Sequence, residues 1–233
     1  MGSSERYAID DVAFIGRTLT EYERMFDLDL SAWEGESVLD CPGGACAFVA
    51  AANASGIDAV GVDLLYDVPP EDLRAKCEAD IDTAIAGFDG VEDQFVWSFY
   101  DDVADVRAHW TAAYQRFIDD YERHYDGDRY LPAKLPDLPF ADDSFSLVLS
   151  AHLMFLYMDK LDHDFHVESL RELARVAREE VRVYPLARFD GERYSRLDDL
   201  RETLSDEGYA TEIRSVPFEF QRGATEMLVV DVR

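Results

Sequence analysis

Lysine is scarce in this chain. Its 22 basic residues include only Lys76, Lys134 and Lys160 as lysines, against 50 acidic residues and a formal net charge of −28. Nucleic acids and anionic membrane surfaces are themselves negatively charged, so they would repel a chain of this composition. We therefore expect no nucleic-acid partner and no membrane partner.

The same imbalance predicts an acidic, halophilic protein that works in a salt-rich cytoplasm. An excess of one charge destabilises the compact state by self-repulsion, and salt screens that repulsion. An ordinary acidic protein from a low-salt cell is the alternative. The scarcity of lysine fits this alternative less well.

Cysteine is scarce as well, and no long apolar run is present. Cys41, Cys46 and Cys77 are an odd number without CxxC spacing, which argues against a disulfide framework or a zinc site. No apolar run approaches the ~18 residues that a membrane-spanning helix needs. The first residues lack the basic and then apolar pattern of a signal peptide. These absences predict a cytoplasmic protein without a metal centre.

What is present is a pattern of short apolar strands and amphipathic helices, which predicts an α/β fold. The chain has 233 residues, of which 48% are hydrophobic, enough for a sizeable core. We expect strands at 37–40, 59–63, 129–134, 144–150, 181–184, 210–216 and 226–233. We expect one or two helices within 9–26, and further helices at 45–55, 69–86, 101–124 and 164–179. The last two strands lack a crossover helix, so they should pair antiparallel.

We treat residues 1–233 as a single domain that contains a helical insertion at 66–127. About 60 residues is more than one strand-to-strand connection through a helix requires. The insertion is either a lid over the site or part of the core, and the sequence leaves both open.

The turn after the first strand carries the clearest ligand-binding signal. Asp40 ends this strand, Gly43 and Gly44 follow it, and Asp63 ends the next strand. Ligands of open parallel sheets bind beyond the carboxyl ends of the strands, where a carboxylate can accept hydrogen bonds from both hydroxyls of a ribose. We therefore expect a cofactor of the nucleoside type.

The residues of this turn favour S-adenosylmethionine over a dinucleotide. A dinucleotide site has a third glycine in the pattern G-x-G-x-x-G, and Ala47 or Phe48 stands at that place here. Asp40 would direct negative charge toward the phosphates of a dinucleotide, which would repel it. The same carboxylate would attract the positively charged sulfonium and amino groups of S-adenosylmethionine. An NAD-type oxidoreductase is the alternative.

Three segments resemble the class I S-adenosylmethionine-dependent methyltransferases. They are VLDCPGG at 38–44, GVD at 61–63 and LPFADDSFSLV at 138–148. The resemblance implies a Rossmann-like sheet of seven strands, mainly parallel with an antiparallel last strand. It also implies methyl transfer to a small-molecule acceptor. A protein that binds the cofactor but has lost transfer activity is the alternative from another functional class.

The resemblance implies a set of cofactor contacts by position. Asp40 and the backbone of the turn would contact the methionine part of the cofactor, and Asp63 would contact the ribose. Two leucines would contact the adenine, and two residues at the end of the 144–150 strand complete the set. These are Asp40, Pro42, Gly43, Gly44, Asp63, Leu64, Leu135, Ser150 and Ala151. The chain departs from the family pattern at Pro42, where a glycine is common, and at Lys134, where many members carry an acid.

The acceptor should bind after the strand at 144–150. His152 follows this strand, and we expect it to act as a general base toward the acceptor; in the alternative it only holds the loop by bonding a backbone carbonyl. Turnover should then fall below about pH 6.5, subject to the shift that burial imposes. Tyr157, Trp110 and Tyr114 are the expected substrate contacts, with a role in the core as their alternative.

Overall fold

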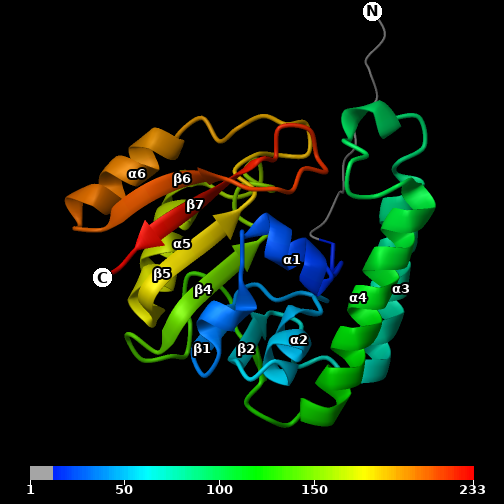
Figure 1. Ribbon diagram of the computed structural model, residues 1–233, viewed down its shortest axis with the longest axis horizontal. Helices are drawn as coiled ribbons and strands as arrows, with labels where there is room; N and C mark the ends of the chain where they lie inside the picture. The colour runs from blue at the N-terminus through cyan, green and yellow to red at the C-terminus, as the bar shows by residue number, and fades with distance from the viewer. Residues whose placement is uncertain (1–12) are drawn as a thin grey trace, which may run out of the picture.

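The strands form one seven-stranded sheet in the order β3-β2-β1-β4-β5-β7-β6. The computed structural model describes residues 13–233 (Figure 1). β7 is antiparallel to both of its neighbours, and the remaining pairs are parallel. The strands are β1 (Ser37–Asp40), β2 (Asp58–Asp63), β3 (Tyr130–Pro132), β4 (Phe145–Ala151), β5 (Ala177–Tyr184), β6 (Ala210–Ser215) and β7 (Glu226–Asp231). This is the Rossmann-like sheet of the class I methyltransferase fold, as the motifs predicted.

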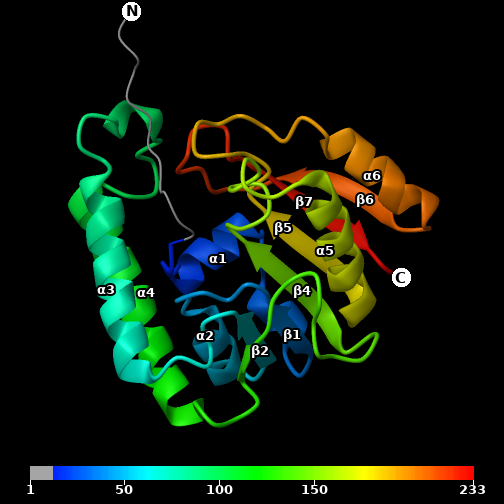
Figure 2. The same ribbon diagram turned by 180° about the vertical axis from the view of Figure 1, so that it is seen from behind.

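Helices cover both faces of the sheet. One face packs against α1 (Leu19–Met25), α2 (Phe48–Ala54), α3 (Pro70–Ala86) and α4 (Val103–His124). The other packs against α5 (His163–Val176) and α6 (Leu197–Asp206), which Figure 2 shows from behind. Neighbouring strand residues alternate between the two hydrophobic clusters, as Val38 and Leu39 do, because successive side chains of a strand point to opposite faces. The sheet is therefore buried on both sides.

The chain reverses its direction across the sheet at β1. From β1 it proceeds through α2 to β2 and then to β3 at the edge, and it returns to β4 on the other side of β1. Such a switch point leaves a crevice beyond the carboxyl ends of the two central strands, and ligands of open α/β sheets bind there. The topology thus places the glycine turn after β1 at the position where a ligand is expected.

The segment 66–127 contains α3, the short 3-10 turn η2 (Glu92–Gln94) and α4. Pro70 begins α3 at a position where its missing N–H costs no hydrogen bond, and the Asp102 carboxylate caps α4 by accepting from the Asp105 N–H. Both helices match their predicted ranges. They pack against each other, and in Figures 1 and 2 α2 lies between them and the labelled strands β1 and β2.

Three sequence-based predictions of secondary structure need correction. In the predicted helical range 9–26, residues 9–12 lie outside the described residues, 13–18 are not helical, and α1 begins at Leu19. The predicted helix 164–179 ends at Val176, because Ala177 already pairs with Phe145 of β4 as the first residue of β5. The sequence analysis missed α6, although Leu197, Leu200 and Leu204 are buried at helical spacing.

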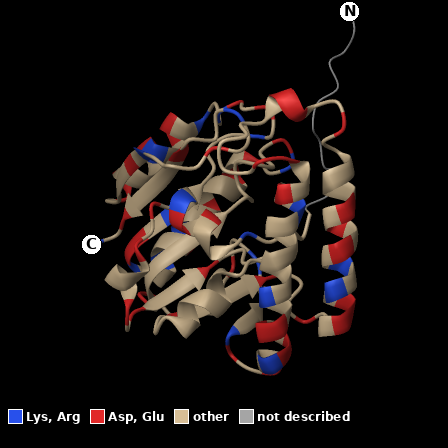
Figure 3. Ribbon diagram, turned by 45° about the vertical axis from the view of Figure 1, so that its right-hand side comes forward, with Lys and Arg blue, Asp and Glu red and all other residues tan. Residues whose placement is uncertain are grey.

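Acidic residues are spread over the helices and loops (Figure 3). Many arginines form ion pairs with acidic side chains. Arg175, for example, forms ion pairs with both Asp142 and Glu172. With 50 acidic and 22 basic residues, most carboxylates cannot have a basic partner of their own. The surface is therefore expected to repel itself at low ionic strength.

We expect the melting temperature to rise between 0.1 M and 2 M KCl. The Debye length falls from about 10 Å at 0.1 M to about 3 Å at 1 M, so repulsion between surface carboxylates is lost. In a domain of this size, each kcal/mol gained should raise the melting temperature by about 2–4 °C. Thermal melts measure this shift, and sucrose at equal osmolality is the control. A melting temperature that stays flat or falls with salt contradicts the expectation.

Candidate cofactor and acceptor site

A cavity of about 710 Å³ lies at the carboxyl ends of the first four strands. Its walls come from the residues that follow β1, β2, β3 and β4, with additions from α3, α5 and the segment before α1. The volume falls within the range of about 300–1,000 Å³ that is usual for small-molecule and cofactor sites. The switch point of the sheet thus holds a cavity that is large enough for a nucleoside cofactor.

Asp63 holds the wall of this cavity together at the end of β2. Its carboxylate accepts hydrogen bonds from the Gly44 N–H at 3.2 Å and from the Leu65 N–H at 3.0 Å. Burial raises the pKa of this carboxyl, and the two N–H groups oppose the shift by stabilising its charged form. Each carboxylate oxygen keeps a further lone pair. Asp63 can therefore still accept hydrogen bonds from a ligand in the cavity.

The glycine turn presents its backbone to the cavity because no side chain fits there. A Cβ on Gly43 would lie 2.5 Å from the Tyr66 hydroxyl, and Gly44 has a φ of +52°, which favours glycine. The Tyr66 hydroxyl in turn donates to the Gly44 carbonyl at 2.8 Å. Tyr66 therefore supports the turn from the side away from the cavity.

Asp40 lies beneath the cavity, not on its wall. The side chain is fully buried, and the Tyr22 hydroxyl of α1 lies 3.0 Å from each of its two carboxylate oxygens. Burial is the main cause that raises the pKa of Asp40 well above its ordinary value. On β1, Asp40 faces the same side as Val38, toward α1 and α2, and for this reason it does not reach the cavity that the sequence assigned to it.

Basic side chains on the cavity wall are the feature that the sequence analysis missed. Lys76 of α3, Lys134 after β3 and Arg17 all line the large cavity, and so it contains two of the three lysines in the chain. Lys76 forms an ion pair with Asp80 at 3.0 Å, and Arg17 lies 3.5 Å from Glu21. The scarcity of lysine was the signal that could have singled these positions out.

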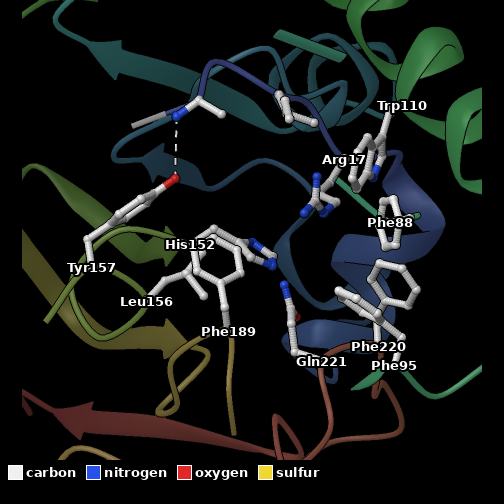
Figure 4. A pocket seen from close by; sticks show the side chains of 12 residues that line it. Arg17, Phe88, Phe95, Trp110, His152, Leu156, Tyr157, Phe189, Phe220 and Gln221 are labelled. Carbon is white, nitrogen blue, oxygen red and sulfur yellow. Dashed lines mark hydrogen bonds between the residues drawn. The ribbon is translucent and has the colours of Figure 1, made fainter. Parts of the chain in front are cut away.

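A second, smaller cavity of about 50 Å³ adjoins the first (Figure 4). Ala13, Ile15, Arg17 and His152 line both cavities, so these residues form the junction between them. Most of the remaining wall is apolar or aromatic, and it is drawn from the insertion, the segment between β4 and α5, the loop after β5 and the loop between β6 and β7. The side chains that complete it are Phe88, Phe95, Trp110, Leu156, Tyr157, Phe189, Phe220 and Gln221.

His152 occupies the junction in a left-handed backbone conformation, with a φ of +53°. Its N–H donates to the Tyr184 carbonyl at 2.8 Å, and its ring packs edge-on against the Tyr184 ring at 5.6 Å. Its Nε2 atom is buried without a hydrogen-bond partner. Burial, and then the charge of Arg17, lower the pKa of His152 well below its ordinary value. The imidazole is therefore neutral at physiological pH.

The other predicted site residues divide into two groups. Pro42, Leu64, Leu135 and Ala151 line the large cavity together with the turn glycines, while Trp110 and Tyr157 line the small one. Ser150 and Tyr114 line neither cavity. The Ser150 side chain is buried within the sheet, and the Tyr114 hydroxyl turns away to donate to Glu78 at 3.0 Å.

Comparison with known proteins finds a relative by sequence. No family model matches the chain. An uncharacterised protein of Methanocaldococcus jannaschii is 29% identical over 223 residues, which cover 95% of this chain and 97% of that protein.

Solved structures of similar fold include methyltransferases. A putative methyltransferase of Haloferax volcanii, solved with the activator Trm112, is 18% identical with a TM-score of 0.48, over 91% of this chain and 90% of that one. Magnesium protoporphyrin IX methyltransferase from Synechocystis, solved with S-adenosylmethionine, is 12% identical with a TM-score of 0.44, over 88% of this chain and 74% of that one.

In residues 13–233, no helix is both long and apolar enough to cross a membrane.

Proposed function

We propose that this chain transfers a methyl group from S-adenosylmethionine to a small-molecule acceptor. The observation that carries the proposal is the placement of Asp63. Its carboxylate is tied to the glycine turn and lies on the wall of a cavity of about 710 Å³ at the switch point of the sheet. A carboxylate at this position can accept hydrogen bonds from both hydroxyls of a ribose.

The residues present fit this cofactor. Leu64 and Leu135 offer apolar surface for an adenine, and the turn at 42–44 offers backbone groups for the methionine part. Asp40 would act from beneath, by holding Tyr22 and the end of β1, because it has no access to the cavity. Arg17 and Lys76 would face the carboxylate of the methionine part. When bound, the cofactor would supply a methyl group on a sulfonium, which leaves as a neutral thioether.

Within this proposal His152 is the catalytic base. Its neutral Nε2 would take the proton that a hydroxyl or an amine of the acceptor gives up on methylation. The walls of the two cavities hold the acceptor and the methyl donor in line, and such positioning can supply roughly 7–11 kcal/mol of the barrier.

The proposal extends to the organisation of the chain. We propose one methyltransferase domain over 1–233, in which the insertion 66–127 forms a side wall of the site, because Lys76 lines the large cavity and Trp110 the small one. We also propose that the protein functions in a salt-rich cytoplasm, which its net charge of −28 supports. The same charge supports the absence of nucleic-acid and membrane partners.

Calorimetry with S-adenosylhomocysteine, S-adenosylmethionine and NAD tests the proposal. We expect the first two to bind and NAD to bind far more weakly; tight binding of NAD alone contradicts the proposal. Incubation with cell extract and methyl-labelled S-adenosylmethionine then separates a transferase from a binding protein, because only the transferase moves label into a small molecule.

A further inference from the structure

The small cavity contains buried polar atoms that the protein itself does not satisfy. Within residues 13–233, five buried side-chain nitrogen and oxygen atoms lack a hydrogen-bond partner, and three of them belong to residues that line this cavity: Trp110, His152 and Gln221. Buried polar groups in proteins are nearly always hydrogen-bonded, and clustered exceptions indicate a missing ligand or water. The cluster therefore identifies a recognition site.

His152 Nε2 and Gln221 Oε1 carry the argument. The indole of Trp110 is close enough to Tyr100 to affect the pKa of that phenol, so we give it no weight here. His152 and Gln221 come from distant parts of the chain, the end of β4 and the loop between β6 and β7. Figure 4 shows their side chains extending toward one another across the cavity. A neutral imidazole nitrogen and an amide oxygen can both accept a hydrogen bond.

We propose that the methyl acceptor is a small, uncharged aromatic molecule with two hydrogen-bond donors on one edge. This inference rests on the proposed function, and it names the substrate class of that site. A ring with two adjacent hydroxyl or amino groups would donate to His152 Nε2 and to Gln221 Oε1. The group that donates to His152 is the one positioned for methylation, because His152 is also the proposed base.

The shape and the walls of the cavity support this class. A cavity of about 50 Å³ holds only a few heavy atoms, so the donor edge would enter it while the ring remains at the junction with the large cavity. The aromatic walls suit the face and edge of a flat ring. They comprise Phe88, Phe95, Trp110, Tyr157, Phe189 and Phe220.

The electrostatics of the wall favour an uncharged ligand. Arg17 is the one charged residue on the wall of the small cavity among the described residues, and Glu21 lies 3.5 Å from its guanidinium. Glu21 is fully buried, so its charge acts on Arg17 with little screening by solvent. Glu21 thus offsets part of the positive charge of Arg17, and among the described residues the wall of the small cavity presents no other charged side chain to a substrate.

Four probes, three neutral and one charged, test the class by calorimetry on the protein without cofactor. Catechol and 1,2-diaminobenzene have two donors on one edge, 1,2-dimethoxybenzene has the same ring without donors, and benzoate carries a charge. We expect the first two to bind, and the other two to bind at least about tenfold more weakly, since two hydrogen bonds are lost. Equal binding of 1,2-dimethoxybenzene and catechol overturns the inference.

The variant Gln221→Leu tests the residue. It should weaken catechol binding by about three- to tenfold, as expected for one hydrogen bond between neutral groups. Because Gln221 Oε1 has no partner in the free protein, the variant should melt no lower than the wild type. Gln115→Leu, at an exposed position of α4 outside both cavities, is the matched control.

Two results contradict the assignment of Gln221. One is an unchanged catechol affinity in Gln221→Leu, and the other is a crystal structure, soaked with catechol, in which only water lies at His152 and Gln221. If Gln221→Leu does not fold, the probe series on the wild-type protein decides. If the protein binds S-adenosylhomocysteine but not catechol, this inference is overturned and the proposed function stands. If it binds catechol but not S-adenosylhomocysteine, the proposed function is overturned.

Discussion

Replacing Asp63 with alanine is expected to weaken the binding of S-adenosylhomocysteine about hundredfold or more. In the proposed complex the variant would lack two hydrogen bonds from ribose hydroxyls to a carboxylate, each worth about 1.5–3 kcal/mol. It also removes the acceptor for the Gly44 and Leu65 N–H groups, so the glycine turn loses its tie to β2. Titration calorimetry measures the change in dissociation constant.

Asp58→Ala is the matched control for this variant. Asp58 begins the same strand, its side chain is exposed, and it lies outside both cavities. Asp63→Asn is a second variant that keeps one acceptor oxygen, and an intermediate loss of affinity is expected for it. If Asp63→Ala melts like the wild type and binds S-adenosylhomocysteine equally well, Asp63 does not contact the cofactor.

Replacing His152 is expected to lower turnover by about 10²–10⁴-fold, the usual contribution of a general base. Cofactor affinity should change little, because the proposed contacts to the ribose and the adenine come from Asp63, Leu64 and Leu135, which follow or end β2 and β3, and not from His152. Asparagine tolerates a φ near +53° better than alanine does, so His152→Asn separates loss of the base from backbone strain. Once an acceptor has been identified, single-turnover kinetics measures the effect. His124→Ala, at the C-terminal end of α4, is the control.

The position of His152 also changes the expected pH dependence. Because burial and then Arg17 lower the pKa of His152 well below 6.5, the ring stays neutral as the pH falls through 6.5. Turnover should therefore persist below pH 6.5 and fall only in more acidic solution, unlike the profile of an exposed histidine. In the unfolded chain the ring would bind a proton near pH 6.5, so this group should also make the fold less stable as the pH falls below that value.

If His152 is only structural, its variants will behave differently. The ring packs against Tyr184, so its loss would lower the melting temperature while each folded molecule keeps its turnover. Measuring the melting temperature and the turnover on the same variant distinguishes the two roles. Unchanged turnover in folded His152→Asn contradicts a catalytic role.

Much of the fold could be predicted because local signals agreed with the tertiary structure. The strands at β1, β2 and β4 are nearly continuous apolar runs, as expected for strands that are buried on both faces. Helices α3 and α4 begin at Pro70 and after Asp102, where the chain has strong start signals. The end of α5 could not be predicted, since pairing of Ala177 with β4 prevails over a helical pattern that continues past it.

The sequence alone determined the residues of the glycine turn, the acid at the end of β2 and the overall acidity. Those features are local, and the conformation of a turn or the end of a strand depends on a few neighbouring residues. Only the tertiary structure decided that Asp40 faces Tyr22 beneath the cavity, and that Ser150 and Tyr114 point elsewhere. It also decided which distant side chains meet, because Arg17, His152 and Gln221 come from segments that only the folded sheet brings together. Burial among these segments sets the protonation of His152, and no pattern in the sequence shows burial of that kind.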